Sequence, residues 1–372
     1  MHILIISCRF RLILIYLHIP NLKMSLSKKN IRIRQESIMR HRRKSNAKSK
    51  SRRRYSRRNK LTIPKYHGRR NPYVAPYVTI DLKKDFRIID NPSEVVDQLN
   101  KILSCRKRQE RSIRLDLNLR GVCHFDLGAL TCLLSTLRFT TNYRGNHPDD
   151  KNCREFFEKS GFLTLMHDVN GHQFATSNTN NLMFEKGTDK TSNAMVGGEI
   201  KRAIKYLTGE EGKFQPVYSI IQEICPNSIE HANSDTRKVN WMMGIQYDDG
   251  KVCFALADKG YGILRTIKKT MTQKVRDQFR NDIEILFAAF DKEYQSQTDD
   301  DNRNKGLPRI KSVADAGFIQ NLTVITNNTL LNLSDVSKSR MLGVNFGGTF
   351  YYWEITKETY NRWKTRKQSI SA

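Results

Sequence analysis

Three polar residues at fixed spacing suggest chemistry in the C-terminal half of the chain. Glu223 and Asn227 stand four residues apart, and Asp258 opens the turn Asp258-Lys-Gly260-Tyr-Gly262 after an apolar segment. Residues four apart share one face of a helix, so the carboxylate and the amide would point the same way. An amide oxygen suits a hard cation such as Mg²⁺, and a carboxylate can orient water for attack. Since glycines let the backbone approach a ligand closely, the set is typical of a nucleotide pocket.

Hydrophobic periodicity predicts the elements that must position these residues. Segment 216–233 has its apolar residues at helical spacing and begins with Pro216, a favourable first-turn residue. Segments 239–247 and 251–257 read as strands joined by Asp248-Asp-Gly250, a strong hairpin signal. Further helices are expected at 198–207 and 308–316, and further strands at 322–326 and 348–355. This pattern predicts helices on one side of a mixed, mostly antiparallel sheet, an α/β sandwich.

The preceding region, residues 73–195, alternates strand and helix patterns, which indicates a smaller α/β layer. Strands are expected at 77–82 and 112–117, and helices at 92–103, 127–140 and 151–160. Asp126 directly precedes one of these helices, where its side chain can cap the free N–H groups.

In their order, the C-terminal motifs resemble the GHKL superfamily of ATP-binding domains, which includes gyrase, the large heat-shock chaperones, histidine kinases and MutL. The resemblance runs from Val217 to Ile355. It implies a Bergerat-type two-layer α/β sandwich that binds ATP and Mg²⁺. By this resemblance Glu223 takes a proton from the attacking water, Asn227 holds Mg²⁺ on the phosphates, and Asp258 accepts a hydrogen bond from the adenine amino group.

The resemblance also implies the other positions of the pocket. They are Gly260, Gly262, Lys305, Gly306, Leu307 and Thr349. The first two let the backbone pass close to the base, and the Thr349 hydroxyl helps to hold Asp258. The phosphate-binding loop contains Gly306, but Asn304 and Pro308 stand where the family has flanking glycines. A helix N-terminus with nearby cations is still a good anion site.

Two further features of the region affect the expected activity. The stretch 264–302 would form a lid that orders when nucleotide binds. Pro226 removes one hydrogen bond inside the helix of Glu223 and Asn227. We expect a kink there that shifts the two side chains relative to each other, which favours nucleotide binding over fast hydrolysis.

Residues 115–130, Leu-Asp-Leu-Asn-Leu-Arg-Gly-Val-Cys-His-Phe-Asp-Leu-Gly-Ala-Leu, resemble the STAS domain, the fold of anti-sigma-factor antagonists. In regulated members of that family a phosphorylatable Ser follows the loop Asp. Leu127 and Gly128 take its place in this chain, so phosphoryl control is not expected there. The predicted organisation is a STAS-like domain at 73–195 and a GHKL-type ATP-binding domain at 196–372.

Most of the net charge of +28 lies before these domains. Residues 28–70 hold 19 Lys or Arg and one acid, Glu36, with little apolar content, so we expect residues 1–72 to be a disordered basic tail. Its partner would be a nucleic acid, unless it is only a solubilising arm. The apolar segment 3–19 is interrupted by charges, which favours a start at Met24 over a membrane-surface segment and predicts no transmembrane segment.

The seven cysteines are scattered without any Cys-x-x-Cys pair, which fits neither zinc nor a disulfide framework and indicates a reducing cytoplasm. A histidine kinase would need a helical hairpin with a phosphoacceptor His before residue 196, and the pattern there is strand and helix in alternation. Gyrase and MutL relatives need a following domain, whereas about 17 residues follow the last expected strand.

We therefore expect an Mg-ATP-binding regulatory protein that controls a protein partner, as a slow ATPase or an anti-sigma-type serine/threonine kinase-like switch. Two alternatives stay open. One is a nucleic-acid-binding protein whose ATP site gates engagement through residues 28–70, and the other is a non-hydrolysing ATP-binding scaffold.

Overall fold

The computed structural model describes only part of the chain. The described residues are 77–107, 114–137, 143–168, 170–174, 181–186, 193–230, 241–270, 279, 281–291 and 306–371. All of them belong to one compact unit. The expectations for the basic tail, the start at Met24 and Lys305 lie outside the described residues.

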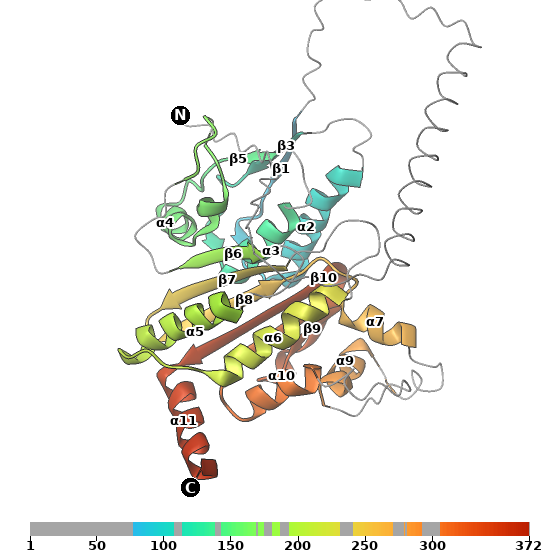
Figure 1. Cartoon of the computed structure of the whole chain (residues 1–372). Coiled ribbons are helices and arrows are strands. Elements are labelled where there is room, and N and C mark those ends of the chain that lie inside the picture. The colour runs from blue at the N-terminus through green and yellow to red at the C-terminus, as the bar shows by residue number, and fades with distance from the viewer. Residues whose placement is uncertain are drawn as a thin grey trace, which may run out of the picture. The chain divides into compact units, whose positions relative to one another are not determined.

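A five-stranded sheet runs through this unit in the order β6-β7-β8-β10-β9 (Figure 1). Its strands are β6 (Leu182–Lys186), β7 (Trp241–Asp248), β8 (Lys251–Ala257), β9 (Gln320–Asn332) and β10 (Arg340–Thr356). All neighbouring pairs are antiparallel. The predicted β7–β8 hairpin is confirmed, and its turn places Gly250 at φ +70°. The sheet begins with β6, a strand from the region predicted to be STAS-like.

One face of the sheet is covered by helices. They are α5 (Asn193–Thr208), α6 (Gln215–Glu230), α7 (Ile263–Thr270), α9 (Asp282–Phe290) and α10 (Gly306–Asp315). Figure 1 shows α5 and α6 lying across the strands. Because side chains alternate along a strand, Val252, Phe254 and Leu256 of β8 all enter the core beneath these helices. We call this side the α6 face.

The opposite side, which we call the α3 face, is covered by the N-terminal elements. Helices α2 (Pro92–Lys107) and α3 (Leu127–Leu137) lie there. Helix α3 is buried along its whole length and contacts α2 on one side and strands β7 and β8 on the other. Gly128 permits this close packing, since a Cβ there would lie 2.7 Å from side-chain carbons of Ile88 and Phe350. Met242, Ala255 and Ala257 share one hydrophobic core with α3.

Beyond α3 lies a small parallel sheet in the order β1-β3-β5 (Figure 1). Its strands are β1 (Tyr77–Asp81), β3 (Arg114–Asn118) and β5 (Tyr143–Gly145), and a second parallel pair joins β2 (Asp85–Phe86) to β4 (His124–Phe125). Helix α4 spans Lys151–Lys159, and α11 (Lys357–Ser371) follows the last strand. The predicted mixed α/β fold class is confirmed. No helix among the described residues is long and apolar enough to cross a membrane.

The segment 264–302, predicted as a lid, contains most of α7 and all of α9. Ile285, Leu286 and Phe290 of α9 lie in the core of the α6 face, together with Leu264 of α7. This part of the segment is therefore packed against the sheet in the described state.

Candidate functional site

The turn after β8 fixes the carboxylate of Asp258. Its Oδ1 accepts hydrogen bonds from the backbone N–H groups of Gly260, at 2.9 Å, and Thr349, at 3.1 Å. The Asp258 N–H in turn donates to the Thr349 carbonyl at 2.9 Å. The resemblance implies a role for the Thr349 hydroxyl, whereas this contact uses the backbone. The strand alternation that buries Leu256 under the helices also directs Asp258 toward the α6 face.

Two polar residues of β9 hold the glycine turn against the sheet. Thr326 Oγ1 accepts a hydrogen bond from the Ile263 N–H at 2.8 Å, and Asn327 Nδ2 donates to the Tyr261 carbonyl at 3.0 Å. Between them Gly262 adopts φ +82°, where a Cβ would lie 2.8 Å from Thr326 Oγ1. The sequence did not predict this role for Thr326 and Asn327, because the pairing of a strand with a distant turn leaves no local periodicity.

Glu223 joins α6 to the helix of the predicted phosphate loop. Its carboxylate forms an ion pair with the guanidinium of Arg309 on α10, whose side chain is 56 % exposed. Gly306 and Leu307, expected in a loop before a helix at 308–316, are instead the first residues of α10, and both are partly buried. In this state the Glu223 carboxylate is occupied by a cation, so it could accept a proton from water only after the pair opens.

The predicted site residues fall into two groups on the α6 face. One contains Asp258 with the backbone of Gly260 and Thr349, and the other contains the Glu223–Arg309 pair. Helix α6 continues through the proline to Glu230, but the side chain of Asn227 lies outside the described residues. The described residues contain no group of three or more His, Cys, Asp or Glu side chains that could hold a metal ion.

The residue after Asp258 points to the opposite face of the sheet. The Nζ atom of Lys259 is buried without a hydrogen-bond partner among the described residues, 4.2 Å from the centre of the Phe346 ring. Burial lowers the pKa of Lys259 to about 8, against the opposing influence of Cys132 on α3 and of Asp258. The ammonium is therefore buried on the α3 face, under the electrostatic influence of Cys132 on helix α3.

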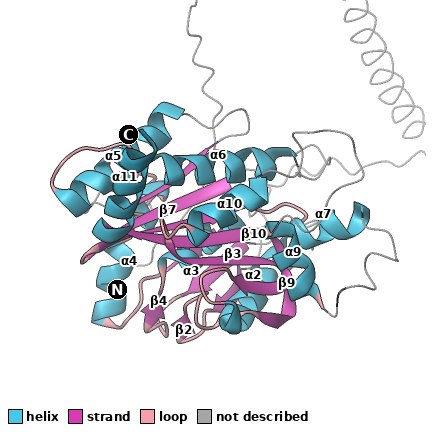
Figure 2. Ribbon diagram, turned by 90° about the horizontal axis from the view of Figure 1, so that it is seen from below, coloured by secondary structure: helices cyan, strands magenta, loops and turns pink. Residues whose placement is uncertain are grey.

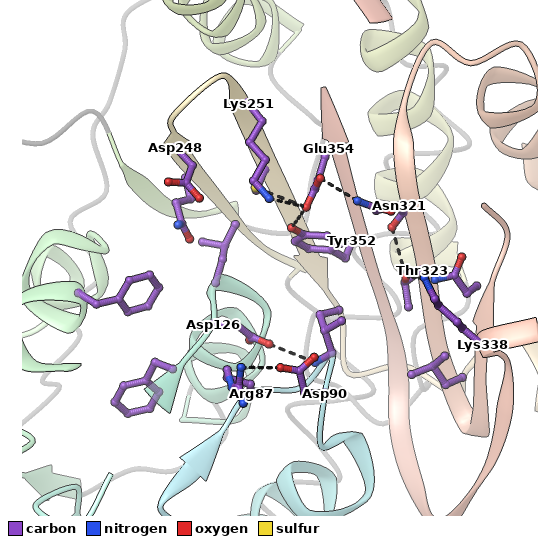
Figure 3. A pocket seen from close by; sticks show the side chains of 18 of the residues that line it. Arg87, Asp90, Asp126, Asp248, Lys251, Asn321, Thr323, Lys338, Tyr352 and Glu354 are labelled. Carbon is purple, nitrogen blue, oxygen red and sulfur yellow. Dashed lines mark hydrogen bonds and ion pairs between the residues drawn. The ribbon is translucent and has the colours of Figure 1, made fainter. Parts of the chain in front are cut away.

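A pocket of about 590 Å³ opens on the α3 face, and Asp258 is not among the residues that line it. Figure 3 shows this pocket from close by. On the sheet side, the Glu354 carboxylate accepts hydrogen bonds from the Tyr352 hydroxyl at 2.5 Å, Lys251 Nζ at 3.1 Å and Asn321 Nδ2 at 2.8 Å. Burial opposes ionisation of Glu354, but these bonds outweigh it and lower its pKa. The carboxylate is fully paired within the protein.

Asp126 lies on the other side of this pocket, near Arg87 and Asp90 (Figure 3). Its predicted role as the N-cap of α3 is confirmed, because Oδ1 accepts from the Ala129 N–H at 2.5 Å. Oδ2 accepts from the Ile89 N–H at 3.1 Å. Burial raises the pKa of Asp126 to about 6, although both backbone bonds favour the charged form. Arg87 pairs with Asp90 at 2.7 Å and with Asp85 at 2.6 Å.

No model of a known protein family matches this chain, and no curated protein matches it. The likeness to GHKL and STAS domains rests on the motifs and their order in the sequence.

Proposed function

We propose that the chain binds Mg-ATP on the α6 face and acts as a nucleotide-dependent switch for a protein partner. The observation that carries the proposal is the fixed carboxylate of Asp258. Two backbone N–H groups that are far apart in the sequence, those of Gly260 and Thr349, converge on its Oδ1. A carboxylate held in this way is a pre-positioned acceptor for an exocyclic amino group, which adenine has and the corresponding edge of guanine lacks.

The phosphates would lie toward the start of α10. The N-terminus of this ten-residue helix carries partial positive charge, and Arg309 adds a guanidinium in its first turn. Incoming phosphate oxygens would compete with Glu223 for Arg309. Release of the Glu223 carboxylate would then leave it available to orient water, while Asn227, one helical turn further on, holds Mg²⁺.

This exchange of partners gives the switch a physical basis. In the described state the Glu223–Arg309 pair ties α6 to α10, and Lys311 on α10 pairs with Asp291 after α9 at 3.2 Å. Nucleotide that binds Arg309 would break its pair with Glu223 and change the contact between α6 and α10. A partner protein that binds the surface formed by α6 and α10 would then bind differently with and without nucleotide. Slow hydrolysis or transfer of the γ-phosphoryl group to a Ser or Thr would reset it.

Calorimetric titration of the full chain with Mg-ATP and Mg-GTP tests the proposal. Asp258→Asn keeps one oxygen for the two backbone N–H groups and loses the charge that selects the amino group. We expect it to weaken Mg-ATP binding at least about tenfold, equivalent to about 1.4 kcal/mol. The matched control is Asp249→Asn in the exposed β7–β8 turn, which should bind as the unaltered chain does. Equal affinity for both nucleotides, or an unchanged Asp258→Asn variant, would overturn the assignment.

Glu223→Gln separates binding from turnover. It should retain Mg-ATP binding and lose phosphate release, because an amide cannot accept the proton of the attacking water. Turnover is measured without addition, with nucleic acid and with candidate protein substrates. Stimulation by nucleic acid would favour the gated nucleic-acid-binding alternative, whereas bound ATP without turnover would favour the scaffold.

A further inference from the structure

Helix α11 presents a set of cations that the sequence patterns did not place on any element. It contains five Lys or Arg and one acid, Glu358. Its apolar side is anchored, since Tyr360 is buried and the rings of Tyr360 and Trp363 both pack 5.4 Å from the ring of Phe214. Figure 2 shows α11 beside α5, which it contacts. The helix is therefore docked on the folded unit, and its remaining surface faces solvent.

Three of these cations, Arg362, Lys364 and Arg366, differ from those basic residues of the described part of the chain that form ion pairs. Elsewhere Lys101 and Lys159 each pair with an acid one helical turn away, at 2.7 Å and 2.5 Å. Among the described residues no acidic side chain forms an ion pair with the three cations of α11, and all three are exposed. We call this set the α11 cations.

Each of the α11 cations lies against an aromatic ring or a glycine. The Lys364 ammonium lies 5.7 Å from the centre of the Tyr360 ring, and the Arg366 guanidinium lies 5.7 Å from that of Phe318. Arg362 lies against Gly317, where a Cβ would collide with its guanidinium. Contact with an aromatic face or with backbone restrains a long side chain, so less rotamer entropy is lost when a ligand binds.

We infer that the α11 cations form a docking surface for the phosphate backbone of a nucleic acid. Unpaired cations at this density attract a polyanion and release its counterions on binding. A membrane-surface helix needs a free apolar side to insert, and that of α11 is already buried against Phe214. This surface does not depend on the nucleotide site.

The test is the salt dependence of oligonucleotide binding by the full chain. The variant Arg362→Gln/Lys364→Gln/Arg366→Gln is compared with the unaltered chain by fluorescence anisotropy of a labelled duplex. Three lost phosphate contacts should reduce the slope of log K against log[salt] by about 2 to 3 and weaken binding about tenfold or more at 0.1 M salt. Because the contacts are to phosphate, the loss should be the same for unrelated sequences.

The matched control neutralises three cations that already have acidic partners, in Lys101→Gln/Lys159→Gln/Lys338→Gln. It should retain the slope of the unaltered chain, and so should the charge-preserving variant Arg362→Lys/Arg366→Lys. Circular dichroism establishes that each variant is folded. An unchanged slope in the α11 variant, or an equal reduction in the control, would overturn the inference. Binding to anionic phosphatidylserine vesicles that depends on the α11 cations, without an effect on the oligonucleotide, would overturn it as well.

Discussion

The two faces of the central sheet differ most sharply at two consecutive residues. Asp258 faces the helices, and two backbone N–H groups hold its carboxylate. Lys259 faces α3, and its buried Nζ has no hydrogen-bond partner among the described residues. On the α6 face, the carboxylate of Asp258 is satisfied by its own turn, which carries a sequence motif, together with the backbone of a distant strand. On the α3 face, large hydrophobic contacts between distant segments dominate, and a buried charge is a cost that the packing must offset.

A side chain added at the glycine that packs against the Asp258 backbone should have the largest effect on stability. Gly348 adopts φ +125°, and a Cβ there would overlap the Asp258 carbonyl. We expect Gly348→Ala to lower the free energy of unfolding by about 3–5 kcal/mol in a urea titration. The adjacent Gly347→Ala is the control, since a Cβ at Gly347 would have no neighbour within 4 Å. Equal stability of the two variants would show that the turn tolerates a side chain.

Removal of the buried charge on the other face should act in the opposite direction. Lys259→Met keeps an unbranched side chain one heavy atom shorter and eliminates an ammonium whose pKa falls from 10.5 to about 8. We expect a gain in unfolding free energy of up to about 3 kcal/mol at pH 7.

The pH dependence checks the cause of this gain. Between pH 8 and 10.5 the unfolded chain binds more protons at Lys259 than the folded protein does, so the stability of the unaltered chain rises over that interval. The Met variant should lack this rise in urea titrations at several pH values. If both proteins respond to pH alike, the ammonium is not desolvated.

The sequence predicted those parts of the fold that repeat within a short window. Helix α6 and the β7–β8 hairpin have periodic apolar residues and clear end signals, so both were found. The charged helix α11 was not predicted, because most of its residues are polar and Tyr360 and Trp363 are too few to form an apolar stripe. Strand β6 was also missed, since its place beside β7 depends on pairing between distant segments.

The same distinction holds for the candidate sites. The turn from Asp258 to Gly262 carries a local motif. The resemblance placed Thr349 beside Asp258 through its hydroxyl, whereas the observed contact is made by the Thr349 backbone N–H. The pocket on the α3 face unites residues from Arg87 to Glu354, and no spacing along the chain marks them as neighbours. Strand alternation could have placed Lys259 on the α3 face, but the burial of its side chain depends on how α3 packs.

Asp126 provides a smaller test on the α3 face. Its pKa is raised from 3.8 to about 6, so the folded protein binds more protons there than the unfolded chain between these values, and stability falls as pH rises through this interval. Asp126→Asn should lose this decrease. The gain in the free energy of unfolding at pH 7 should be only about 1–2 kcal/mol, because the new amide places an N–H group next to the Ile89 N–H and this contact offsets part of the gain. Thermal unfolding at pH 4 and pH 7 measures it, and an unchanged pH response would contradict the assignment.

The Glu223–Arg309 pair should contribute least to stability. Arg309 is largely exposed, so the coupling energy from a double-mutant cycle of Glu223→Gln and Arg309→Gln should be below about 1 kcal/mol. A larger value would mean that the pair joins α6 to α10 too strongly for ligand phosphate to displace it readily.

Hydrogen–deuterium exchange of the full chain with and without Mg-ATP tests the central claim most directly. Nucleotide bound against Asp258 should slow the exchange of peptides that contain Gly260–Gly262, the first turn of α10 and Thr349, and Mg-GTP should leave them unchanged. Mg-ATP that protects none of these peptides, or that protects only those lining the pocket between Asp126 and Glu354, would contradict the account.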